Sequence, residues 1–115
     1  MDMNPIVGPR LPRRESGWVT LPDAYAGFQF RFWLNAPQRL WNDVESGDDK
    51  PAKAALSQIM LEHNGWADTD GTPFPPASDP AFWDLIPTEL AAVTLAVSYE
   101  EMTALAKSLA PKKRR

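Results

Sequence analysis

The chain has 115 residues, a formal net charge of −3 and no cysteine. This length provides for one hydrophobic core and excludes a conventional two-domain enzyme. Without cysteine, disulfide-stabilised scaffolds, zinc–thiolate sites, iron–sulfur clusters and thiol nucleophiles are excluded as well. No apolar run approaches the roughly 18 residues of a membrane span, and the N-terminus lacks a secretory pattern, so we expect a soluble protein that stays in the cytosol.

Charge is distributed unevenly along the chain. Residues 1–14 carry a net charge of +2, and residues 112–115 (Lys-Lys-Arg-Arg) carry +4. Residues 15–111 hold fourteen acidic against five basic side chains. An acidic body binds duplex nucleic acid poorly, since phosphate binding requires cations gathered on the folded surface. The basic ends are therefore either solvated tails or arms that contact nucleic acid or an acidic partner.

The N-terminal third predicts an arm followed by a β-hairpin. Residues 1–16 contain three prolines and no apolar periodicity, which is typical of a flexible arm. Residues 18–21 are β-prone, and residues 22–27 begin with Pro and end with Gly, as turns do. In residues 28–34, phenylalanine or leucine then occupies every second position, which predicts a strand. A lone hairpin is marginal in water, so another element must cover its Phe face.

Two helices are predicted next. Asn35 is placed to cap a first helix that ends at Gly47. Asp48 or Asp49 caps a second helix, whose apolar residues recur at helical spacing through His63 before an Asn-Gly stop signal.

The C-terminal half begins with a long connection, residues 65–79, which is rich in Gly, Pro and Asp and has aromatic anchors. Asp79 and the following proline open a short helix. For the remainder there are two alternatives. Either a new helix begins at Tyr99 behind the capping-box sequence Ser-Tyr-Glu-Glu, or one helix runs from residue 88 to residue 109.

No motif predicts catalysis or metal binding. His63 is the only histidine, and on an apolar helical face near a C-terminus it is interpreted as a core or boundary residue. Asp68 and Asp70 resemble part of a calcium loop, but Trp66 and Ala77 occupy two of its ligand positions, so an EF-hand is rejected. We expect these carboxylates to accept local backbone N–H groups.

Aromatic residues are the positive signal, with five Trp and five Phe. Most are expected to fill the core of so small a domain. Trp33 lies opposite the phenylalanines of its strand, so it is either exposed or covered by a further layer of helices. Exposed aromatics mark protein contacts more often than catalysis. The predicted protein-binding residues are Trp33, Trp66, Phe74 and Trp83.

Two stretches resemble the tail assembly chaperones of long-tailed bacteriophages. The first is Leu-Pro-Asp-Ala-Tyr-Ala-Gly at 21–27, followed by Asn-Ala-Pro at 35–37. The second is residues 64–75 (NGWADTDGTPFP), followed by Ile-Pro-Thr-Glu-Leu at 86–90. Together they span roughly residues 17–97, which is most of the predicted domain.

This resemblance implies a protein without catalytic activity or cofactor that acts in the host cytoplasm. Such chaperones bind the tape measure protein, the long helical chain that sets tail length, and help recruit tail tube subunits. The family often adds a longer product by ribosomal frameshifting. The Lys pair at 112–113 is compatible with slippery codons, although it is equally compatible with a solubilising tail.

A second hypothesis is a virion structural protein, such as a head–tail connector or minor tail component, which would form a stable ring. A small hydrolase or a nucleic-acid binder is a third. We expect no membrane partner.

Together these patterns predict an α+β domain, mainly α, with an N-terminal β-hairpin packed on a bundle of four or five short helices. The predicted divisions are a flexible basic and proline-rich arm (1–16), a single globular domain (17–110) and a basic disordered tail (111–115). No catalytic, cofactor-binding or metal-binding residue is predicted.

Overall fold

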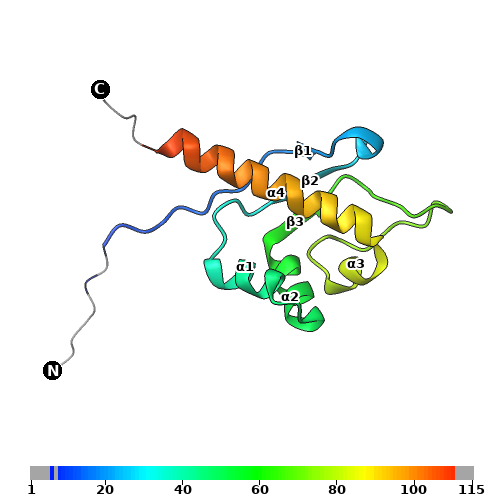
Figure 1. Cartoon of the computed structure of the whole chain (residues 1–115), viewed down its shortest axis with the longest axis horizontal. Coiled ribbons are helices and arrows are strands. Elements are labelled where there is room, and N and C mark those ends of the chain that lie inside the picture. Colours follow the sequence, from blue (N-terminus) through cyan, green and yellow to red (C-terminus); the bar gives the residue numbers. More distant parts are fainter. Residues whose placement is uncertain (1–5, 7, 111–115) are drawn as a thin grey trace.

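The computed structural model describes residue 6 and residues 8–110, and it confirms the α+β class (Figure 1). The predicted tail at 111–115 lies outside the described residues, as do residues 1–5 and 7 of the predicted arm. The strands are β1 (Val19–Thr20), β2 (Gln29–Phe32) and β3 (Met60–His63). The α-helices are α1 (Gln38–Glu45), α2 (Asp49–Ile59), α3 (Pro80–Leu85) and α4 (Thr88–Leu109), and a 3-10 turn, η1, covers Asp23–Tyr25.

The three strands form an antiparallel sheet in the order β1-β2-β3. The β1–β2 hairpin is as the alternation predicted, and its two central phenylalanines, Phe30 and Phe32, are buried. The structure differs from the predicted arrangement, in which a hairpin alone packs on a bundle of four or five short helices. The sheet has a third strand, and the chain from residue 8 to residue 110 forms four α-helices, one of them 22 residues long.

The predicted extension of the second helix through His63 was wrong. The helix ends at Ile59, and residues 60–63 form β3, in which Met60 lies opposite Phe32 and His63 opposite Phe30. Pairing with β2 satisfies backbone groups that a two-stranded hairpin would leave at an open edge. Because Ile59 and Met60 are both buried, the apolar pattern was consistent with a helix and did not reveal where the period changes.

Predicted cap residues occupy the cap position at two of the three helices for which a cap was predicted. Asp48 occupies this position at α2, but its side chain forms no capping hydrogen bond; Asp79 caps α3 by accepting a hydrogen bond from the amide of Ala81 at 3.0 Å. At α1 the prediction was wrong, because Pro37 occupies the cap position and no side chain caps the helix. Asn35 instead binds the N-terminal segment.

Helix α4 is continuous, so the break at Tyr99 does not occur. The Ser98 hydroxyl donates to the carbonyl oxygen of Thr94, and the Thr94 hydroxyl donates to that of Leu90, both at 2.8 Å. Both side chains are buried. Ser98 therefore satisfies its hydrogen-bonding group within an unbroken helix and does not cap a new one.

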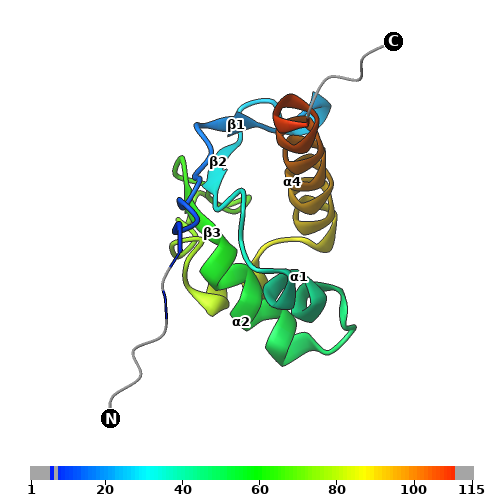
Figure 2. The same cartoon turned by 90° about the vertical axis from the view of Figure 1, so that its left-hand side faces the viewer.

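The core lies between the sheet, the helices α1 to α3, and α4. Figure 2 shows the sheet on one side, α4 on the other, and α1 with α2 across one end of the space between them. Apolar side chains from all three sets fill that space, among them Phe30, Phe32, Leu40, Ile59, Phe82 and Leu90. Among the described residues no helix is long and apolar enough to cross a bilayer.

The predicted arm ends earlier than residue 16, because residues 12–16 are bound to β2 and its extension. The Ser16 amide donates to the carbonyl oxygen of Phe32, and the Ser16 hydroxyl accepts from the Phe32 amide, both at 2.9 Å. Asn35 donates to the carbonyl oxygen of Pro12 at 2.7 Å and accepts from the amide of Arg14 at 2.8 Å. Proline content thus correctly indicated the absence of a helix, but polar side chains fix this segment to the domain.

Candidate functional site

Two of the four predicted protein-binding residues are buried, so these two predictions were wrong. Trp66 is 3% exposed, and its indole N–H donates to the carbonyl oxygen of Gln29 and to the side chain of Asn64. Trp83 is also buried and donates to the carbonyl oxygen of Ala77 at 3.1 Å. Most buried indole N–H groups have a hydrogen-bond acceptor, and backbone carbonyls accept from these two. Trp66 and Trp83 are therefore core residues.

Trp33 is half-buried, whereas the two predicted alternatives were an exposed ring and a ring covered by a further layer of helices. The guanidinium of Arg13 lies over its ring, 4.2 Å from the ring centroid, and its N–H donates to Asn35 at 2.9 Å. The N-terminal segment, and not a layer of helices, covers Trp33. Its role in the structure is to hold residues 12–16 against the domain.

His63 is half-buried at the boundary of the core, and it lies on strand β3 and not on a helix as predicted. Its ring stacks on Trp66 and on Phe82, with ring centroids 5.5 and 5.0 Å apart. Nδ1 accepts from the amides of Gly65 and Trp66 at 3.1 and 3.0 Å. Nε2 lies 2.9 Å from the carbonyl oxygen of Pro75, and because Nδ1 is an acceptor, Nε2 carries the proton and donates. Both ring nitrogens are thus engaged in tying the 64–75 loop to β3.

The connection after β3 is held by its own side chains, as predicted. Asp68 Oδ1 accepts from the amides of Asp70 and Thr72, both at 3.1 Å. A side-chain hydrogen bond with Asp68, together with the hydroxyl and amide hydrogen bonds from Thr72, lowers the pKa of Asp70 to about 2. Asp70 therefore stays ionised at neutral pH. Gly71, with φ +88°, supplies the positive φ that closes this turn.

An apolar groove of about 350 Å³ lies where this loop meets the turn after β1 and the start of α4. Aromatic side chains form its walls: Tyr25 and Phe28 pack edge to face at 5.5 Å between ring centroids, and Phe74 is half-buried opposite. Leu85, 58% exposed, lies at its edge. Asp68 adds a carboxylate to the lining. Of the predicted binding residues, only Phe74 lines this groove.

A second apolar surface lies along one face of α4. It is a stripe of residues that recur at alternating intervals of four and three. The stripe consists of Ala91, Leu95, Ser98, Met102, Leu105 and Leu109, all apolar except the buried Ser98. Its first half faces the core, and Leu95 and Met102 pack partly against it. Leu105 is half-buried and Leu109 is 59% exposed, because the end of α4 extends past the rest of the domain (Figure 1). The stripe thus continues beyond the body that covers it.

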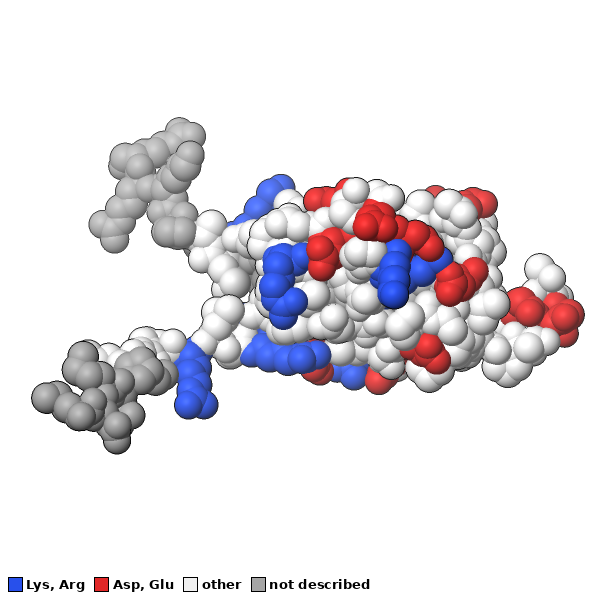
Figure 3. Space-filling model, turned by 90° about the horizontal axis from the view of Figure 1, so that it is seen from below, with Lys and Arg blue, Asp and Glu red and all other residues white. Residues whose placement is uncertain are grey.

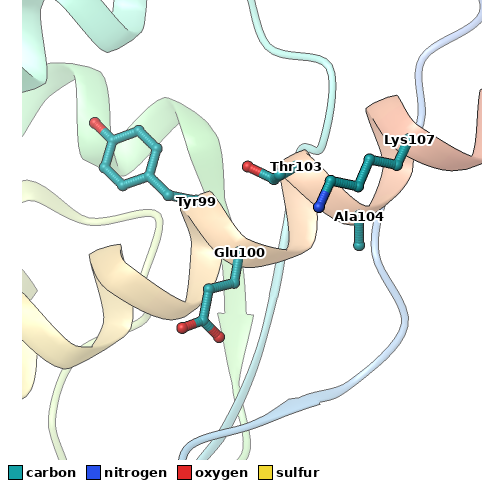
Figure 4. A pocket seen from close by; sticks show the side chains of 5 residues that line it. All are labelled: Tyr99, Glu100, Thr103, Ala104 and Lys107. Carbon is teal, nitrogen blue, oxygen red and sulfur yellow. The ribbon is translucent and has the colours of Figure 1, made fainter. Parts of the chain in front are cut away.

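A shallow hollow on the surface of α4 offers no converging chemistry. Its lining residues all come from that one helix: Tyr99, Glu100, Thr103, Ala104 and Lys107. Their side chains point in different directions around the helix (Figure 4). Catalysis requires a nucleophile or base held against a positioned partner, and this hollow lacks that arrangement.

Sequence reasoning missed most of the groove residues. Tyr25 lies in a predicted turn, and no sequence pattern pointed to Leu85 or Leu90 as residues of a binding surface. The groove forms only because three segments that are distant in sequence meet: the turn after β1, the loop after β3 and the start of α4. The alternating four- and three-residue spacing on α4 can be seen in the sequence. Whether the side chains of this stripe are exposed depends on how far the domain extends along the helix.

Comparison of the chain with models of protein families, with curated proteins and with solved structures found no match.

Proposed function

We propose that this protein is a tail assembly chaperone of a long-tailed bacteriophage that binds the tape measure protein in the host cytoplasm without catalysing a reaction. The resemblance of residues 17–97 to such chaperones supports this function. The structural observation that carries it is the apolar stripe on α4, which extends past the domain that covers its first half.

The spacing of the stripe suits a helical partner. Apolar residues at alternating four- and three-residue intervals pack against a second helix with the same repeat, as in coiled coils. Towards the end of the stripe Met102 and Leu105 are only half-buried and Leu109 is exposed, which leaves room for such a helix beside α4. A tape measure protein is a long helix whose apolar side is exposed until the tail tube surrounds it. Covering that side would keep the chain soluble.

Release follows from weak contacts. Many copies would each bind the tape measure protein through a small apolar area, so tube subunits with larger interfaces can displace them one at a time. A longer frameshifted product would attach this binding unit to a second segment that recruits tube subunits. The nucleotide sequence across codons 110–115 tests this part directly, because slippage requires a slippery heptamer and an overlapping frame.

Retention of the tape measure protein tests the binding surface. The tagged full-length chain, co-expressed with the long helical product encoded nearby, should retain it in a pull-down and keep it in the soluble fraction. Leu105→Asp and Leu109→Asp should each weaken retention about tenfold or more, because a charge replaces a buried leucine contact. Thr103→Asp is the matched control, since it adds the same charge to an exposed position on another side of α4.

Two results would contradict the proposal. Retention that is unaffected by both leucine variants would show that α4 is not the binding surface. Failure of the unmodified chain to bind the long product, together with a stable place in purified virions, would support the connector or minor tail component instead.

A further inference from the structure

The groove beside α4 has the chemistry of a site for extended, proline-containing peptides. Aromatic side chains line such sites, because proline rings pack flat against aromatic faces and an already extended peptide loses little conformational entropy on binding. Tyr25, Phe28 and Phe74 provide these faces, and Pro87 and Leu90 extend the apolar lining. The Asp68 carboxylate on the lining favours a cation next to the prolines.

The chain itself carries a segment of this kind. Residues 9–12 read Pro-Arg-Leu-Pro, a P-x-x-P sequence that contains a basic residue. All four are exposed and lie outside helices and strands, with Leu11 82% exposed. Arg10 forms no ion pair within the part of the chain that the structure describes. The groove and this segment therefore complement each other in both apolar surface and charge.

Leu11 cannot reach the groove of its own molecule. Leu11 precedes Pro12, whose carbonyl oxygen is fixed by Asn35, so it reaches only about 4 Å beyond that anchor. From Trp33, beside this anchor, to Phe28 at the groove the chain runs about 17 Å along β2. In Figure 1 the arm leaves one end of the molecule, and η1 and the start of α4 lie at the other end.

We propose that the groove of one copy binds residues 9–12 of a second copy, with Leu11 against the aromatic walls and Arg10 beside Asp68. This inference goes beyond the proposed function and uses a different surface from the α4 stripe. The contact joins two different patches, so each copy keeps a free groove or a free arm. Copies can then add head to tail.

The charge distribution of the molecule agrees with this direction of assembly. On the face shown in Figure 3, most basic side chains lie in the half that carries the N-terminal segment and the end of α4, and the protruding tip at the other end is acidic. Opposite charges therefore meet when copies line up head to tail, and association should weaken as salt increases.

Sedimentation velocity on the full chain tests the proposal with one variant for each side of the contact. The average mass of the unmodified protein should rise above the 12.8 kDa of the monomer as the protein concentration increases up to about 1 mM. Leu11→Asp removes the arm contact, and Leu85→Asp places a charge at the groove edge; each alone should remain monomeric. An equimolar mixture of the two variants should form two-chain complexes and nothing larger, because one supplies only a groove and the other only an arm.

Matched controls separate these effects from added charge. Gly8→Asp adds the same charge to the arm, and Ala81→Asp adds it to an exposed position of α3; both should assemble like the unmodified chain. Circular dichroism checks that every variant is folded. Unmodified chain that stays monomeric over the whole range would overturn the proposal, and so would a mixture of Leu11→Asp and Leu85→Asp that does not associate. Association of either variant on its own as strongly as the unmodified chain would also overturn it.

Discussion

The hydrogen bonds of His63 give this residue a structural role that needs one particular protonation state. Nδ1 accepts two backbone N–H groups and Nε2 donates to the carbonyl oxygen of Pro75. The ring also stacks on both Trp66 and Phe82, which contact each other with ring centroids 5.5 Å apart. The loop that begins at Asn64 is therefore fixed to β3 through one side chain, and no atom of the ring is left to act as a general base.

Replacing His63 with phenylalanine separates stacking from hydrogen bonding. His63→Phe keeps an aromatic ring packed against both Trp66 and Phe82 but leaves two amides and one carbonyl without their partner. We expect the free energy of unfolding in urea to fall by about 1–3 kcal/mol. Gln58→Ala, at an exposed position of α2, is the control and should change it by less than about 0.5 kcal/mol. Equal stability of the two variants would mean that stacking alone fixes the loop.

At the scale of elements, α4 is joined to α1 through Tyr99. The Tyr99 ring packs on Trp41 with ring centroids 5.0 Å apart, and its hydroxyl donates to Glu45 Oε1 at 2.8 Å. Burial, together with the hydrogen bond to Glu45 and the charge of that carboxylate, raises the pKa of Tyr99 to about 12 from its ordinary 10.0. The contact therefore depends on the neutral phenol.

Alkaline pH should weaken this contact selectively. Below about pH 10 the phenol is neutral in both folded and unfolded chains, so its contribution to stability is fully present. Between about pH 10 and pH 12 the unfolded phenol ionises while the folded one does not, and the contribution is lost as the pH rises through this range. Tyr99→Phe should cost about 1 kcal/mol at about pH 8, and this difference should shrink towards zero by about pH 11.5 in urea unfolding. A difference that grew with pH would contradict the assignment.

At the scale of the whole molecule, the N-terminal segment has two parts with different functions. Residues 12–16 are bound to β2 and its extension by backbone and side-chain hydrogen bonds and by the packing of Arg13 on Trp33. Residues 9–11, exposed just before them, form the P-x-x-P sequence together with Pro12. The first part stabilises the domain, and the second is available to another chain.

Truncation distinguishes the two parts. Removing residues 1–11 should change the free energy of unfolding by less than about 0.5 kcal/mol at low protein concentration, where self-association does not contribute. Removing residues 1–16 also deletes the buried Ser16 and leaves the Phe32 amide and carbonyl unpaired, so stability should fall by about 2–3 kcal/mol. If both truncations had equal stability, residues 12–16 would not belong to the domain.

The sequence by itself determined the features that depend on neighbours along the chain. Alternation gave the β1–β2 hairpin, Asp48 and Asp79 marked the starts of α2 and α3, and the Asp-rich turn closes on its own amides. The α+β class follows from these local patterns, because backbone geometry and side-chain period decide them within a few residues.

Only the tertiary structure decided the rest, because it depends on pairing between distant segments. β3 exists because β2 has a second edge to satisfy, the buried Trp66 donates to the carbonyl oxygen of Gln29 on β2, and residues 12–16 are fixed by Asn35. The groove arises where three segments far apart in sequence meet. No local pattern contains these contacts, since each is stabilised by a partner whose position is set by the folded chain as a whole.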